Sequence, residues 1–121
     1  MINGFHHAQI TIPPGTDEEA KRFYCDILEL KEIPKPESLL GRGGFWVQVG
    51  HQQLHIGTEE GVDRLRTKAH LAYEVDDLKQ IEEKLKYNGI EIISAIPISG
   101  FERFEFRDPF GNRVECIKPV L

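Results

Sequence analysis

Four side chains that can exchange protons stand at equivalent places in the two halves of this sequence. The first half supplies His7 and His55, and the second supplies His70 and Glu115 at nearly the same separation. Successive side chains of a strand point to opposite faces of its sheet. In the strands that carry these four residues, polar and apolar residues alternate, so all four share the polar face. Imidazole and carboxylate groups move protons and hold polar ligands. The pattern therefore predicts a site on this face of the sheet.

The same face carries further polar side chains that fit a small-molecule ligand. The predicted hairpin register places Trp46 opposite His55. There the indole either stacks on a ligand or closes the cup-shaped space over the polar face. Arg103 can clamp a carboxylate or a phosphonate through two hydrogen bonds. Glu105 is a second acid/base candidate, although a simple pairing with Arg103 is favoured. The predicted substrate-binding residues are Gln9, Trp46, Gln48, Arg103 and Glu105.

The elements that position these residues form a repeat. Each half reads as a strand, a helix and then extended, hairpin-like sequence, so the chain is two βαβββ modules at residues 5–57 and 69–118. A polar linker at 58–68 joins them, and we expect the whole chain, 1–121, to form a single domain. The hairpin turns are predicted at Gly50-His51 and at residues 108–112.

Capping and stop signals delimit the two predicted helices. Thr16 and Glu19 match a capping box ahead of an amphipathic apolar stripe. The second helix is expected to begin after Asp77 and to end near Gly89, which suits the left-handed position after a helix. The stretch 32–44, rich in proline and glycine, reads as a long loop at the edge of the first sheet.

Composition excludes several classes of partner. The 121 residues carry a net charge of −5 without a Lys/Arg cluster, which argues against a nucleic acid or an anionic membrane as partner. The sequence shows no transmembrane run and no signal-peptide pattern at its start. The cysteines, Cys25 and Cys116, match no zinc or redox spacing. We expect a small cytoplasmic protein with reduced thiols.

Four segments together resemble the vicinal oxygen chelate superfamily, which includes glyoxalase, bleomycin-resistance proteins, fosfomycin-resistance transferases and extradiol dioxygenases. The segments are HAQITIP at 7–13, FYCDILEL at 23–30, HLAYEVDD at 70–77 and DPFGNRVE at 108–115. The resemblance implies an α+β fold in which two tandem βαβββ modules form cupped mixed sheets. It also implies a homodimer and a divalent metal, with His7, His55, His70 and Glu115 as the ligands. Imidazole and carboxylate suit Fe, Mn, Co, Ni or Zn.

Three departures from the family pattern matter, the first of which is a helix-end detail that leaves the site untouched. Glu29 stands where relatives commonly carry glycine, and His55 stands where glyoxalase I has a carboxylate. Gln9 lies near the position of a threonine in the fosfomycin transferases, and residues 98–102 lack their potassium-binding, serine-rich loop. His55 therefore has three open roles: a fourth ligand, a group that supports a ligand, or a histidine merely hydrogen-bonded in the cup.

Two functions follow from the resemblance. The first is a metal-dependent enzyme acting on a small molecule with vicinal oxygens, in which Glu115 moves a proton; lyase or isomerase chemistry and oxygenation both remain open. The alternative is a metal-free protein of the bleomycin-resistance type that sequesters a small molecule in the same cup. Whether the ligands come from one chain or from two also remains open.

Overall fold

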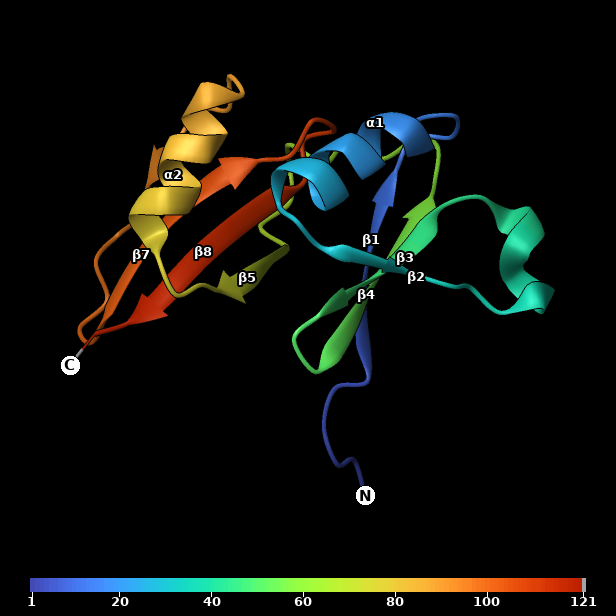
Figure 1. The fold of residues 1–121 in the computed structure, drawn as a ribbon, viewed down its shortest axis with the longest axis horizontal. Coiled ribbons are helices and arrows are strands. Elements are labelled where there is room, and N and C mark those ends of the chain that lie inside the picture. The colour runs from blue at the N-terminus through green and yellow to red at the C-terminus, as the bar shows by residue number, and fades with distance from the viewer. Residues whose placement is uncertain (121) are drawn as a thin grey trace. The chain divides into compact units, whose positions relative to one another are not determined.

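The computed structural model describes residues 1–120, and its contacts divide the chain into two compact units (Figure 1). Unit 1 is Met1–Val62, and unit 2 begins at Asp63, inside the predicted linker. Each unit contains a four-stranded mixed sheet and a helix, which confirms the predicted α+β class with two tandem modules. The proposed single domain spanning both units stays a prediction.

Unit 1 is built on a sheet with strand order β1-β4-β3-β2, in which β1 runs parallel to β4 and the other pairs are antiparallel. Its core forms where the helical segment lays Ala20, Phe23 and Tyr24 inward, and all three are buried. In chain order the elements are β1 (His7–Ile12), α1 (Asp17–Lys21), its π-helical continuation η1 (Arg22–Ile27), β2 (Lys31–Ile33), the 3₁₀ helix η2 (Glu37–Arg42), β3 (Phe45–Val49) and β4 (Gln52–Thr58).

Unit 2 repeats this topology with strand order β5-β8-β7-β6 (Figure 1, yellow to red). Leu85 of its helix is fully buried, as are Phe106 and Val114 of the two central strands. No helix within residues 1–120 is both long enough and apolar enough to cross a membrane. The elements are β5 (His70–Glu74), α2 (Leu78–Tyr87), β6 (Ile93–Ser94), β7 (Phe101–Arg107) and β8 (Arg113–Pro119).

The predicted register of the first hairpin is confirmed. Val49 pairs with Gln52 across the first turn, which places Trp46 opposite His55. In the second hairpin, the buried carboxylate of Asp108 organises the turn between β7 and β8. It accepts hydrogen bonds from the backbone N–H of Phe110 at 2.9 Å and of Asn112 at 2.8 Å, and from the Asn112 amide at 2.9 Å.

Two local predictions are wrong. Thr16 forms no capping box, because its hydroxyl donates to the carbonyl oxygen of Pro13 at 2.6 Å and caps no N–H of α1. The stretch 32–44 is not simply a loop, since it contains most of β2 and all of η2. By contrast, α2 begins as predicted, with the Asp77 side chain accepting from the N–H of Gln80 at 3.0 Å.

Candidate functional site

The polar face of the unit 1 sheet carries a stack of three rings. The imidazole of His55 on β4 lies flat against the Trp46 indole on β3, with ring centroids 3.6 Å apart and an interplanar angle of 2°. Its other face meets the imidazole of His7 on β1 at 4.0 Å and 17°. The structure thus brings together the two unit 1 histidines that the sequence singled out, and it holds one of them between two rings.

His55 is held as a neutral, buried imidazole. His55 is 6% exposed, and its Nε2 lies 2.9 Å from the amide oxygen of Gln53. Burial lowers the pKa of His55, and the neighbouring His7, His6 and Lys35 lower it further. An Nε2–H that donates to Gln53 leaves Nδ1 as the lone-pair nitrogen. Covered on both faces, His55 has the surroundings of a packed, hydrogen-bonded group.

His7 is the more accessible of the two histidines. Its Nδ1 lies 3.0 Å from Nδ1 of His6, a contact in which one ring must donate and the other accept. The rings of His6 and His7 meet edge to face, with centroids 5.2 Å apart. This contact engages Nδ1 and leaves Nε2 of His7 as the ring nitrogen that a ligand can use.

These rings border a cavity of about 410 Å³ in unit 1. Gln9 lines it beside Gly57, and a Cβ at position 57 would lie only 2.7 Å from the Gln9 amide nitrogen. Gln48, also predicted to bind substrate, is not among the lining residues, and its amide donates to the carbonyl oxygen of Gly50 at 2.9 Å. The cavity is lined by His7, Gln9, Lys35, Leu39, Arg42, Gly43, Trp46, His55, Ile56, Gly57 and Thr58.

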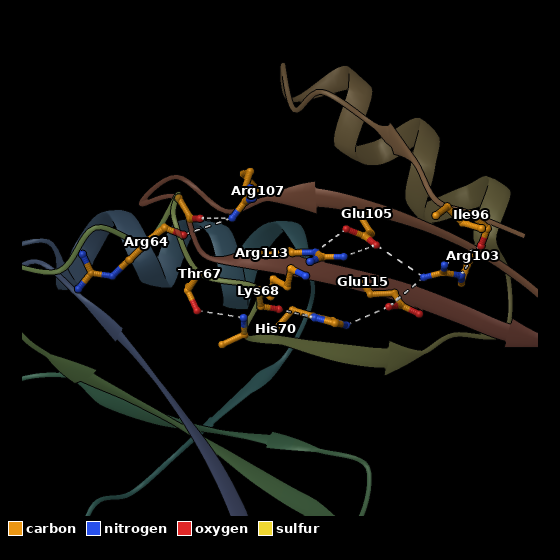
Figure 2. A network of polar contacts seen from close by, with 12 residues as sticks. Arg64, Thr67, Lys68, His70, Ile96, Arg103, Glu105, Arg107, Arg113 and Glu115 are labelled. Carbon is orange, nitrogen blue, oxygen red and sulfur yellow. Dashed lines mark hydrogen bonds and ion pairs between the residues drawn. The ribbon is translucent and has the colours of Figure 1, made fainter. Parts of the chain in front are cut away.

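In unit 2, His70 and Glu115 meet on the polar face of the second sheet (Figure 2). Nε2 of His70 on β5 lies 3.2 Å from Oε1 of Glu115 on the neighbouring strand β8. The same carboxylate oxygen lies 3.3 Å from the guanidinium of Arg103 on β7. Glu115 is 5% exposed, and within residues 1–120 these two side chains are the polar partners of its carboxylate.

The backbone sets the tautomer of His70. Its Nδ1 lies 2.9 Å from the carbonyl oxygen of Lys68, an acceptor that requires a proton on Nδ1. In the neutral ring, Nε2 then carries a lone pair that faces the carboxylate of Glu115. Two electron-pair donors at 3.2 Å repel each other unless a proton or a cation lies between them. This pair is therefore built to share a positive charge.

Glu105 is engaged differently from the predicted pairing. Arg103 lies 3.6 Å from it, as expected, but its closer partner is Arg113, which donates to both carboxylate oxygens at 2.6 and 2.9 Å (Figure 2). The hydrogen bond from Arg113 lowers the pKa of Glu105. Arg103 itself donates twice to the carbonyl oxygen of Ile96, at 3.1 and 2.6 Å. The Glu105 carboxylate and the Arg103 guanidinium are therefore both held by contacts within the protein.

Across residues 1–120, no group of three or more His, Cys, Asp and Glu side chains is assembled as a metal site. Each unit instead gathers a pair: His7 with His55, and His70 with Glu115. Sequence reasoning missed the cavity-lining cations Lys35 and Arg42 and the pairing of Glu105 with Arg113. Cations within a glycine-rich stretch beside a polar sheet face were the available signal for the first two.

Comparison with known families decides the relationship. Residues 4–116 match the family described as the glyoxalase/bleomycin resistance protein/dioxygenase superfamily. The chain belongs to this superfamily. A solved glyoxalase family protein from Bacillus anthracis is 38% identical, with a TM-score of 0.92, and the match covers 99% of this chain and 98% of that one.

The other matches are at lower identity, and the FosX structure among them shares the fold. FosX from Listeria monocytogenes, a fosfomycin resistance protein solved with Mn(II) and sulfate, is 18% identical with a TM-score of 0.80, over 100% of this chain and 94% of that one. A mercuric reductase from Staphylococcus aureus is 24% identical over 90 residues, which are 74% of this chain and 16% of that protein. The chain thus matches about a sixth of the length of that curated relative.

Proposed function

We propose that this protein is a divalent-metal-dependent enzyme that acts on a small molecule with vicinal oxygens. His7, His70 and Glu115 hold the metal, which is one of Fe, Mn, Co, Ni or Zn. Membership of the superfamily supports this assignment, as does the Mn(II) bound in the structure of FosX, a protein of the same fold. Two imidazoles and a carboxylate form a donor set that leaves coordination positions open for substrate.

The arrangement of His70 and Glu115 is the observation that carries the proposal. The Lys68 carbonyl keeps a proton on Nδ1 of His70, so that Nε2 and the Glu115 oxygen, 3.2 Å apart, both offer lone pairs to the same space. A backbone carbonyl that orients the far nitrogen of a histidine is the usual support of a metal-ligating imidazole. The residues present therefore fit a divalent cation.

We assign the proton transfer to Glu115. The bound metal supplies a Lewis acid that polarises the substrate oxygens. Glu115 takes or returns the proton, while Arg103, 3.3 Å from its Oε1, keeps the carboxylate oriented. His55 holds the ring of His7 in place by stacking and is not itself a ligand in this scheme. Such a site serves lyase or isomerase chemistry, or oxygenation if the metal is redox-active.

The proposed ligands are divided between the two units, with His7 in unit 1 and His70 and Glu115 in unit 2. We propose that the protein works as a homodimer, and the ligands of one metal then come either from one chain or from two. Mixing His7→Ala chains with Glu115→Ala chains shows whether the ligands of one metal come from one chain or from two. If the ligands come from different chains, the mixture regains metal in some of its sites; if they come from one chain, it regains none.

Elemental analysis of the untagged protein tests metal binding directly. We expect close to one metal per chain after loading, and its loss in both His70→Ala and Glu115→Ala. His51→Ala is the matched control, because His51 is an exposed turn residue and its loss leaves the ligands intact. Glu115→Gln is expected to keep the fold and lose turnover. Retention of full metal content in His70→Ala would overturn the ligand assignment.

One observation favours the metal-free alternative. Arg103 already compensates the charge of Glu115, and a protonated His70 completes a network that needs no metal. In that case the protein sequesters a small molecule in the unit 1 cavity, as a binding protein of the bleomycin-resistance type. Failure of the wild-type chain to take up any of the five metals on titration would select this function.

A further inference from the structure

We infer that the substrate carries an oxyanion group, a carboxylate or a phosphonate, which Lys35 and Arg42 bind in the unit 1 cavity. Both side chains line this cavity together with His7. The inference rests on the proposed function, because it places the anionic end of the substrate in the cavity that a proposed metal ligand also lines. It defines the class of substrate, which the metal ligands alone do not.

The charge of the cavity wall is the first argument. Among the described lining residues there are two cations, Lys35 and Arg42, and no aspartate or glutamate. The chain as a whole carries a net charge of −5, so a carboxylate-free wall with two cations runs against the overall balance. Guanidinium and ammonium groups facing a shared space recognise carboxylate, phosphonate and phosphate oxygens.

The segment that carries these cations is fixed to α1 and to β4. The N–H of Gly44 donates to the Asp17 carboxylate at 3.0 Å, and the Thr58 hydroxyl donates to the Arg42 carbonyl oxygen at 3.3 Å. A Cβ at Gly44, whose φ is +81°, would collide with the carbonyl oxygen of Ile56. The close approach of this segment to β4 therefore requires glycine, and it sets where Lys35 and Arg42 stand.

Both cations keep hydrogen-bonding capacity for a ligand. The Lys35 ammonium donates to the carbonyl oxygen of Gly43 at 2.7 Å, which uses one of its three protons. Within residues 1–120, Arg42 contributes only its backbone carbonyl to a hydrogen bond, and its guanidinium has no intramolecular partner. A cavity of about 410 Å³ lies within the range that holds small-molecule ligands. Trp46 and Leu39 supply apolar wall for the rest of the molecule.

An NMR titration of the full-length, EDTA-treated chain tests the inference without metal. Phenylphosphonate and benzoate are the anionic probes, and benzyl alcohol is their neutral counterpart. We expect saturable shifts of the Trp46 indole and Gly57 amide signals with the anions and none with the alcohol. The tighter of the two anions identifies the preferred oxyanion.

Charge-removing variants locate the binding groups. Arg42→Gln removes a guanidinium that makes no hydrogen bond or ion pair within residues 1–120, so the fold is kept, and it should weaken the binding of phenylphosphonate about tenfold or more. Lys35→Gln should do the same. Arg22→Gln and Lys31→Gln, exposed positions outside the cavity, are the matched controls and should bind as the wild type does. Unchanged affinity in Arg42→Gln and Lys35→Gln, or equal binding of benzyl alcohol, overturns the inference.

The outcome is separable from that of the proposed function. If the chain takes up metal but binds neither anion, the proposed metal ligands stand and the oxyanion site is refuted. A chain that binds phenylphosphonate through Arg42 but takes up no metal retains the oxyanion site and loses the metal-dependent reaction.

Discussion

The turn between β7 and β8 should depend strongly on the side chain of Asp108. Asp108 is 4% exposed, and its carboxylate accepts from two backbone N–H groups, those of Phe110 and Asn112. Asp108→Ala leaves both donors without their partner. A hydrogen bond to a charged group contributes about 1.5 kcal/mol or more, so the two together predict a loss of about 3 kcal/mol in the free energy of unfolding.

A second aspartate provides the matched control. Asp77 caps α2 through one backbone hydrogen bond, from Gln80 at 3.0 Å, and it is exposed. Asp77→Ala should cost about 1 kcal/mol, the usual value for a lost helix cap. Urea unfolding followed by far-UV circular dichroism measures both variants. Trp46, the single tryptophan of the sequence, lies in unit 1, so its fluorescence reports on unit 1 while the dichroism reports on both units.

The turn also positions the proposed metal ligand. It fixes the register in which Glu105 on β7 lies opposite Glu115 on β8. Asp108→Ala should therefore weaken metal uptake as well as stability. If Asp108→Ala costs no more free energy than Asp77→Ala, the count of buried hydrogen bonds does not govern stability here, and the reasoning is refuted.

Three further predictions concern other positions. Glu29, the one non-glycine residue with positive φ (58°) in the described part of the chain, should gain about 1 kcal/mol of stability as Glu29→Gly, measured by thermal unfolding; a lower melting temperature would contradict this. Glu105→Gln should destabilise at pH 7: the pKa of Glu105 is lowered by Arg113, so its contribution is present above the ordinary carboxyl pKa and lost as pH falls through the lowered value. Urea unfolding at pH 7 and in acid should show that difference closing, and a constant difference would refute it. Native thiol titration should modify Cys25 slowly, since burial and Glu32 raise its pKa, and Cys116 only after unfolding, since burial raises its pKa to about 12; rapid native labelling of Cys116 would contradict its burial.

Side-chain parity was sufficient to predict which residues share the polar face. The alternation along the strands and the two-residue turn at Gly50 placed Trp46 opposite His55, and the structure confirms that register. Both depend on contacts close in sequence, where backbone geometry leaves few choices. The hairpins of each module were predictable for the same reason, whereas the parallel pairs β1–β4 and β5–β8 join strands far apart in the sequence, and the fold class came from the family resemblance.

Partners set by long-range competition could not be predicted. Glu105 had two arginines within reach on its own face, and only the side-chain geometry shows that Arg113 makes both short hydrogen bonds. The Thr16 hydroxyl donates to the Pro13 carbonyl oxygen instead of capping an N–H of α1, and the two hydrogen bonds are of nearly equal strength. Lys35 and Arg42 line the cavity because their segment contacts β4. No periodic pattern in the sequence indicates that contact.

The two units share one topology but present different chemistry on corresponding faces. In unit 1 the face is aromatic and imidazole-rich, whereas in unit 2 it is a network of carboxylates and guanidinium groups. A duplicated scaffold of this kind lets selection act on each half separately. Under the proposed function, changes near Lys35 and Arg42 would alter which molecule is bound, whereas changes near Glu115 would alter the reaction.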